Sequence, residues 1–295
     1  MSRRRLGERA LPRSQPKRRT NSPSYPRIDV ALPTSILRVE HTLFLKSMRV
    51  HQVVRWSSIF GVKRVIFYHD HETSRQERRE YEKLIGALWK YFLTPPYLRK
   101  ILVPLNPLLK YVGALPPLRL RVYEVSPQVT DGEKRLGYRD PSSGLIFLGD
   151  KKSYKPLNEC GEGIVYVRVV DTSSRLAECL DEEVYKGPSL VFENSLRDAC
   201  ARNSNMFIIA TDKNGIIPGL REARKVRGEQ EILVLFGSPS RDLFELAALE
   251  GFKLEDYVDA VWNTVPGQMV VSVRTEEALL STLAVLNMFI KGFLD

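Results

Sequence analysis

Short apolar strands alternate with helical segments at both ends of this 295-residue chain. The stretch "RIDVALPTSIL", residues 27–37, predicts a strand that leaves into a turn, and residues 40–60 then carry apolar side chains at helical spacing. Gly61 occupies the favoured position after that helix, and Val62–Tyr68 predicts a strand buried on both faces. A charged helix is expected over about 74–92. Such alternation is typical of an α/β layer with a parallel sheet.

The middle of the chain has a different pattern. Prolines punctuate the segment that ends near residue 118, and they are too frequent for one long helix. From about Arg119 to Lys186 the runs "RLRVYEV", "GLIFLG" and "GIVYVRVVD" alternate in polarity and are separated by Gly, Asp and Lys turns. This spacing predicts a small β-barrel or sandwich, with the oligonucleotide-binding barrel as one form.

The α/β pattern returns in the last third. The strands "MFIIATD", "EILVLFGSP" and "YVDAVWNTVP" follow the helices "SLRDACARN", "GLREARKVRG" and "RDLFELAALEG". A further strand is predicted at Met269–Val273, ahead of a final helix. The simplest domain organisation is a basic tail (1–26), an α/β domain (27–118 and 187–295) and an inserted OB-like β domain (119–186).

The composition is that of a globular protein that needs no membrane. Hydrophobic residues make up 43% and charged residues 27% of the chain, and no apolar run reaches the roughly 18 residues that span a bilayer. The amino terminus has no apolar segment of a secretory signal. Three cysteines lie far apart at Cys160, Cys179 and Cys200. They predict a reducing compartment, the cytoplasm, with neither a disulfide nor a zinc site.

The basic tail has two interpretations. Residues 1–27 carry a net charge of +8 out of +10 for the whole chain, and they are too rich in Pro and Ser to fold alone. The tail is either an arm that binds RNA phosphates with salt-sensitive affinity or a solubilising terminus. The basic residues that would contact RNA are Arg3, Arg4, Arg5, Arg13, Lys17, Arg18 and Arg19.

Three strand ends in the last third finish in small or polar residues: "IIATDKNG", "LVLFGSP" and "VWNTVPGQ". In an open α/β sheet, ligands bind beyond the carboxyl ends of the strands. Gly237 would let a ligand approach the backbone closely. The alternative is that all three are ordinary turns between strand and helix.

The motifs "FGSP", "NTVPGQ" and "SVRTEEALLSTLAVLN", with "YLRKILVPLNPLLKYVGALPPL" upstream, resemble the archaeal and eukaryotic branch of the SPOUT methyltransferases. This branch comprises α/β-knot enzymes described as RNA uridine-N3 methyltransferases. The resemblance extends from about Ile28 to the C-terminus and includes the split architecture. It implies a parallel sheet with a C-terminal trefoil knot, which is an exception to the rule against threaded chains. It also implies a twofold homodimer with each cofactor pocket near the partner subunit.

The resemblance further implies that the knot's loops bind S-adenosyl-L-methionine and release S-adenosyl-L-homocysteine. Thr211–Gly215 would be the first cofactor loop, although "ATDKNG" departs from the Gly-Thr-Ser type of loop. Phe236 and Gly237 would line the second loop, and Thr264–Gln268 would be the third. Met269–Thr275 would close the pocket, with Thr275 as the N-cap of the last helix. The cofactor-binding residues implied are Thr211, Phe236, Gly237, Asn263, Thr264, Val265, Pro266, Gln268, Val273, Arg274 and Thr275.

The activity that follows from the resemblance is methylation of uridine N3, with ribosomal RNA as the expected substrate. N3 lies on the pairing edge, so the target base must be unpaired or flipped out. Positioning should supply most of the catalysis because the methyl donor is already activated. No proton acceptor is evident, and the weak candidates for catalysis are Arg197, Arg202, Asp212 and Arg274.

Two other functions stay open. One is an RNA-binding assembly factor that keeps the fold but has little or no methyl transfer. The other is methylation of a different base, such as pseudouridine at N1. A metal site at "YHDHET", residues 68–73, is a weaker hypothesis than a polar strand exit, because alternate residues of a short turn rarely converge on one ion, so no metal is expected.

Overall fold

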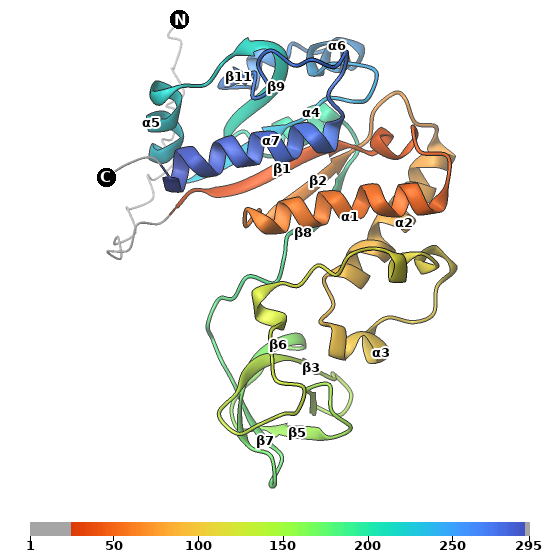
Figure 1. Ribbon diagram of the computed structural model, residues 1–295, viewed down its shortest axis with the longest axis vertical. Helices are drawn as coiled ribbons and strands as arrows, with labels where there is room; N and C mark the ends of the chain where they lie inside the picture. The colour runs from red at the N-terminus through yellow and green to blue at the C-terminus, as the bar shows by residue number, and fades with distance from the viewer. Residues whose placement is uncertain (1–24, 293–295) are drawn as a thin grey trace, which may run out of the picture.

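A six-stranded parallel sheet forms the centre of the larger lobe of the computed structural model, which describes residues 25–292 (Figure 1). Its strand order is β11-β9-β10-β1-β2-β8, and every neighbouring pair is parallel. The strands are β1 (Arg27–Pro33), β2 (Arg64–Tyr68), β8 (Ser189–Glu193), β9 (Phe207–Ile216), β10 (Glu231–Leu235) and β11 (Ala260–Trp262). The predicted parallel sheet is confirmed. The edge strand β8 was missed, because "SLVFE" follows a polar turn and only its last residue is buried.

Helices cover both faces of this sheet. One face packs on α1 (Leu43–Ile59), α2 (Arg75–Phe92), α5 (Leu220–Gly228) and α7 (Thr275–Asn287), and a π-helical turn (Met288–Gly292) follows α7. The opposite face packs on α4 (Leu196–Ala201) and α6 (Leu243–Leu249). Successive strand residues point to opposite faces, so Val30 and Leu32 belong to the first core and Ala31 to the second. A strand buried on both sides therefore appears in the sequence as a continuous apolar run.

The predicted stop of the first helix at Gly61 and the predicted bounds of the second helix are confirmed. Thr42 caps α1, and Gly61 follows that helix with φ +73°, a conformation that favours glycine. At the start of α2, the Ser74 hydroxyl accepts from the Glu77 N–H, and the Glu77 carboxylate accepts from the Ser74 N–H. Such reciprocal bonds satisfy backbone donors that the first turn leaves free.

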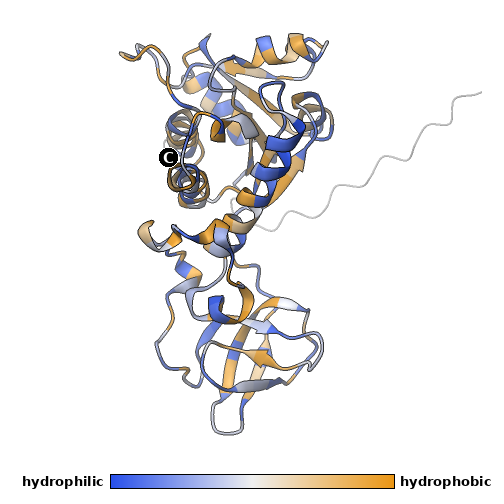
Figure 2. Cartoon of the chain, turned by 90° about the vertical axis from the view of Figure 1, so that its right-hand side faces the viewer, coloured by the Kyte–Doolittle hydropathy of each residue, from blue (hydrophilic) through white to orange (hydrophobic). Residues whose placement is uncertain are grey.

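A closed five-stranded barrel forms the second lobe (Figure 2). Its strands are β3 (Lys134–Arg139), β4 (Ile146–Phe147), β5 (Ser153–Pro156), β6 (Gly163–Asp171) and β7 (Leu176–Cys179). The predicted small barrel is thus confirmed, but the predicted strand "RLRVYEV" is wrong. Arg121–Tyr123 forms a 3-10 turn instead, because the buried Tyr123 packs on the α/β core and donates its hydroxyl to the Leu93 carbonyl at 2.8 Å.

The segment between the lobes is a series of short turns, as its prolines predicted. These are Pro96–Leu98, α3 (Arg99–Leu102), Pro107–Leu109 and Val112–Ala114. Tyr97 ties this segment to the barrel, since its hydroxyl donates to the Leu136 carbonyl at 3.0 Å.

The barrel contains a disulfide between Cys160 and Cys179, so the expectation of no disulfide was wrong. The two residues are 19 apart in sequence, and their Cα atoms lie 5.6 Å apart. The Asn158 side chain brings them together, because it donates to the Cys179 carbonyl and accepts from the Cys179 N–H, both at 2.8 Å. Cysteine spacing alone does not reveal such pairing. Cys200 is buried and free.

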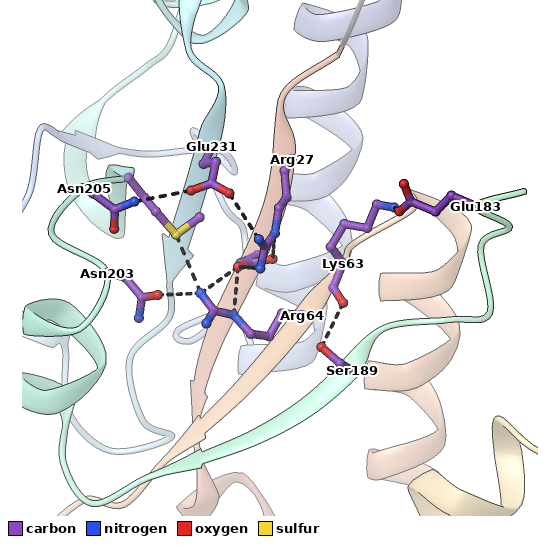
Figure 3. A network of polar contacts seen from close by, with 10 residues as sticks. Arg27, Lys63, Arg64, Glu183, Ser189, Asn203, Asn205 and Glu231 are labelled. Atoms are coloured by element: carbon purple, nitrogen blue, oxygen red, sulfur yellow. Dashed lines mark hydrogen bonds and ion pairs between the residues drawn. The ribbon is translucent and has the colours of Figure 1, made fainter. Parts of the chain in front are cut away.

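A polar network joins the amino ends of β1, β2 and β10 (Figure 3). The fully buried Asp29 carboxylate accepts from Arg64 Nε at 2.8 Å and from Arg27 at 3.1 Å. Arg27 also pairs with Glu231, and Arg64 also donates to Asn203. Burial raises the pKa of Asp29, and the two guanidiniums act in the opposite direction. This network lies at the edge of the sheet formed by the amino ends of the strands, opposite their carboxyl ends.

No helix within residues 25–292 is both long and apolar enough to cross a membrane. The predicted RNA-contacting residues from Arg3 to Arg19 lie outside the described residues.

Candidate functional site

A cavity of about 400 Å³ lies at the carboxyl ends of β9, β10 and β11. Its volume falls within the roughly 300–1,000 Å³ that small-molecule sites occupy. Its lining comes from three segments that are distant in sequence: Thr211–Lys213, Phe236–Asp242 and Trp262–Val273. Thr275 and Ala278 at the start of α7 close it. The cavity is therefore at the edge where open α/β sheets bind ligands.

Nine of the eleven residues expected to bind a cofactor line this cavity. They are Thr211, Phe236, Gly237, Asn263, Thr264, Val265, Gln268, Val273 and Thr275. Pro266 is exposed on the adjoining turn. Arg274 points away from the cavity, with a 65% exposed side chain 3.9 Å from Glu40. The structure thus gathers the motif residues in one place, apart from these two.

Eight lining residues lie outside the segments predicted to bind the cofactor. Most of them belong to "FGSP" or follow it, and the pattern of polar residues before α6 was the signal that could have found them. They are Ser238, Pro239, Ser240, Arg241, Asp242, Glu245, Trp262 and Ala278.

Polar side chains of the motif segments form hydrogen bonds to backbone groups of neighbouring segments. The Asn263 amide donates to the Lys213 carbonyl at 2.7 Å and accepts from the Val265 N–H at 3.1 Å. The Thr211 hydroxyl donates to the Leu235 carbonyl at 2.8 Å. These side chains hold the loops in place, so their own hydroxyl and amide groups are occupied by backbone partners.

Three local predictions about these segments were wrong. Thr211–Gly215 is not a loop, because β9 continues to Ile216 and pairs there with Trp262 of β11. Met269–Val273 is not a strand, and Met269 and Val271 are 98% and 99% exposed. It has no neighbouring strand within the described residues, and β-propensity cannot substitute for one.

Thr275 is also not the N-cap of the last helix. Arg274 holds that position with an extended backbone, and its N–H donates to the Glu277 carboxylate at 3.0 Å. Thr275 is the first helical residue, and its hydroxyl bonds to the chain at Gly237 instead. A cap one residue earlier than predicted is a common error at helix ends.

Gly237 is required by the packing of the chain itself. A Cβ at this position would lie 2.9 Å from the Arg241 carbonyl oxygen and 3.3 Å from the Asp242 Cα. The glycine therefore allows the segment 238–241 to fold back onto the end of β10.

The cavity lining is both charged and apolar. It contains the cations Lys213 and Arg241 and the carboxylates Asp212, Asp242 and Glu245. The apolar side chains of the lining include Phe236, Val265 and Val273. The cavity can therefore accept a ligand with one apolar and one polar or charged part.

Only one of the catalytic candidates reaches the cavity. Asp212 lines it, with one carboxylate oxygen accepting from the Asn214 N–H at 2.7 Å. Arg197 packs over the Phe252 ring at 5.5 Å, and Arg202 pairs with Glu193 at 3.3 Å. Both belong to the region of α4 near β8, at the far edge of the sheet from β11. Arg274 does not line the cavity.

The segment "YHDHET" is a polar strand exit, but a buried one. His69 contacts Thr34 through Nδ1 at 3.1 Å and Glu82 through Nε2 at 2.7 Å, and burial lowers its pKa. Asp70 accepts from the Ser35 hydroxyl at 2.5 Å, and burial raises its pKa. The described residues contain no group of three or more side chains placed to hold a metal ion.

The chain matches the model of a protein family described as "Putative RNA methyltransferase" over residues 27–139 and 161–286. These ranges cover well over half of the chain, so the protein belongs to this family. The family membership confirms the recognition made from the sequence motifs. The unmatched residues 140–160 include β4 and β5 of the barrel.

Similar proteins occur in archaea and in an animal. An uncharacterized protein of Halobacterium salinarum is 28% identical over 283 residues, which cover 88% of this chain and 98% of that protein. Another from Haloarcula marismortui is 27% identical over 287 residues, with the same coverage of 88% and 98%. A 28S rRNA (uridine-N(3))-methyltransferase of Drosophila melanogaster is 30% identical over 168 residues, which cover 51% of this chain and 32% of that enzyme.

Proposed function

We propose that the protein uses S-adenosylmethionine to methylate uridine N3 in ribosomal RNA. The observation that carries the proposal is the convergence of nine motif residues on one cavity at the carboxyl ends of three parallel strands. Membership of the RNA methyltransferase family supports the class of reaction. The name of the Drosophila relative supports the choice of base and atom.

The cavity fits the proposed cofactor. The hydroxyls of Thr211 and Thr275 and the amide of Asn263 are occupied in bracing the loops, so adenine and ribose would meet backbone groups and apolar surface. The three carboxylates of the lining outnumber its two cations, which favours a ligand with a sulfonium charge. S-adenosylmethionine supplies, when bound, a methyl group that is already activated for transfer.

The residues of the chain would contribute mainly by positioning. The apolar side chains of Phe236, Val265 and Val273 line the cavity, and a less polar surrounding strengthens the electrostatic interactions of the charged lining residues. The target base must leave its pair to expose N3, so single-stranded or flipped uridine is the form that binds. Asp212 is a carboxylate of the cavity lining and is the candidate proton acceptor.

Several parts of the proposal concern architecture. We propose that the α/β domain comprises 27–118 and 187–295 and that α7 passes through a trefoil knot. The barrel of 119–186 is proposed as an oligonucleotide-binding module, which suits its five strands. We also propose that the protein is a homodimer and that it is located in the cytoplasm.

Deleting residues 1–24 should weaken RNA binding and reduce its dependence on salt, because the tail's charges would no longer displace counterions.

Calorimetric titration with S-adenosylmethionine and S-adenosylhomocysteine tests the cofactor site. The Val265→Arg variant fills the cavity with a long charged side chain and should weaken binding at least tenfold. Val270→Arg is the matched control, because Val270 is 58% exposed on the neighbouring loop and does not line the cavity. Equal binding by both variants would place the cofactor elsewhere.

Nucleoside analysis of treated ribosomal RNA then separates the alternatives. N3-methyluridine is the expected product, and N1-methylpseudouridine would indicate the other base. RNA binding without any cofactor binding or methyl transfer would favour an assembly factor of the same fold.

A further inference from the structure

The turn Ser238–Arg241 carries a cation to the cavity on a rigid support. The Ser238 N–H donates to the Arg241 carbonyl at 3.0 Å, and the Arg241 N–H donates to the Ser238 hydroxyl oxygen at 3.0 Å. Gly237 lets this turn lie against the end of β10, as described above. The Arg241 backbone is thus held by the hydrogen bonds to Ser238 and by its close contact with Gly237.

A buried carboxylate fixes the Arg241 side chain. Glu72 follows β2, and its side chain is only 4% exposed. Its Oε1 atom accepts from the Ser238 hydroxyl at 2.6 Å and from Arg241 Nη1 at 3.3 Å. The Glu72 N–H in turn donates to the buried Asp70 carboxylate at 2.9 Å. Arg241 is therefore connected to the sheet through a chain of hydrogen bonds.

The outer part of the guanidinium remains available. The Arg241 side chain is 43% exposed, and its bond to Glu72 uses one of the five N–H donors of a guanidinium. Lys213, the other cation of the lining, makes no side-chain ion pair among residues 25–292. A fixed, partly exposed guanidinium can hold a planar acceptor with defined geometry, whereas a flexible ammonium cannot.

We propose that Arg241 is a catalytic residue that stabilises the negative charge of the target uracil, and that Glu72 is its positioning residue. The inference rests on the proposed function. In that reaction the N3–H bond breaks and its proton passes to solvent. The N3 electron pair then forms the bond to the methyl carbon, and the sulfonium sulfur keeps the electrons of the bond that breaks. Before transfer, negative charge spreads over N3, O2 and O4, where guanidinium donors stabilise it most.

The test measures methyl transfer from S-adenosylmethionine to unmodified large-subunit ribosomal RNA transcribed in vitro. Arg241→Gln should lower kcat on the order of 100- to 1000-fold, the usual cost of losing one donor to developing negative charge. Its deficit should shrink as the pH approaches the pKa of the uracil imide, because the base then ionises without help. The affinity for S-adenosylhomocysteine should stay within about threefold of the unaltered protein.

Three more variants complete the design. Glu72→Gln should show a smaller loss of kcat with the same dependence on pH, since Arg241 remains but is less well held. Arg241→Lys should recover only part of the activity, because an ammonium lacks the forked geometry. Lys253→Gln is the control, because Lys253 is an exposed cation after α6 that does not line the cavity.

Different failures have different meanings. A loss confined to cofactor affinity would assign Arg241 to the methionine carboxylate, and a rise in KM for RNA with unchanged kcat would assign it to a phosphate. Either result overturns the inference, as does full activity of Arg241→Gln. Absence of methyl transfer by the unaltered protein would instead reject the proposed function, and the inference with it.

Discussion

The hydroxyl of Thr275 donates a hydrogen bond of 3.1 Å to the carbonyl oxygen of Gly237. This bond joins the first residue of α7 to the exit of β10. Two turns further along the helix, the hydroxyls of Thr282 and Thr264 lie 2.8 Å apart. The last helix is therefore attached to two separate loops of the cavity, so its position and the shape of the cavity depend on each other.

Thr275→Val should weaken both folding and cofactor binding. Loss of one buried hydrogen bond costs about 1 kcal/mol, and a similar loss in binding would lower the affinity about fivefold. Thermal denaturation and calorimetry with S-adenosylhomocysteine measure the two effects. Ser281→Ala is the control on the same helix, because its hydroxyl bonds only to the Glu277 carbonyl at 2.9 Å. If both variants bind equally, the Thr275 bond does not shape the cavity.

Gly237→Ala should destabilise the protein even without a ligand. The new Cβ would meet the Arg241 carbonyl at 2.9 Å, and overpacking against backbone typically costs about 1–3 kcal/mol. Gly228→Ala is the comparison, since nothing lies within 4 Å of a Cβ there and no positive φ is involved. Urea denaturation of the two variants should therefore separate them clearly. Equal stability would mean that the 238–241 segment moves away at little cost.

The sequence predicted the strands and helices better than it predicted which segments lie next to one another. The apolar runs at Val62–Tyr68 and Glu231–Leu235 were recognisable as buried strands because both faces are covered. Met269–Val273 has a similar composition but is exposed loop, because the sequence does not show whether a partner strand is present. The Cys160–Cys179 bond was not predicted for the same reason, because it depends on how β5 and β7 pair.

The site was predictable in its position but not in its charges. Motif residues at three strand ends converge because parallel strands end at one edge of the sheet. Arg241 was missed because its role depends on Glu72, which is 169 residues away in sequence. Contacts between residues so far apart in sequence depend on the topology of the fold, and a local sequence pattern does not reveal them.

Acidification should destabilise the protein through buried histidines. His51 is 3% exposed and packs edge-on against Phe92 at 5.1 Å, and burial lowers its pKa from 6.5. An unfolded chain therefore takes up a proton near pH 6.5 while the folded chain does not. The free energy of unfolding should fall as the pH drops from 6.5 toward the lower pKa of the folded state. His51→Gln should flatten this slope in denaturant titrations, and an unchanged slope would contradict the assignment.

Reduction of the Cys160–Cys179 bond should loosen the barrel. The bond closes a loop with a sequence separation of 19, and a cross-link of this length stabilises by roughly 3 kcal/mol in the chain-entropy model. A reductant should therefore lower the Tm of the barrel transition in the native protein and leave that of a Cys160→Ser/Cys179→Ser variant unchanged. Thiol titration of the unfolded, unreduced chain supplies the independent check, because Cys200 is the only free cysteine when the bond is formed. Three reactive thiols and a Tm insensitive to reductant would show instead that the two cysteines stay reduced. In that case the Asn158 bonds to Cys179 would be what holds β7 to the loop after β5.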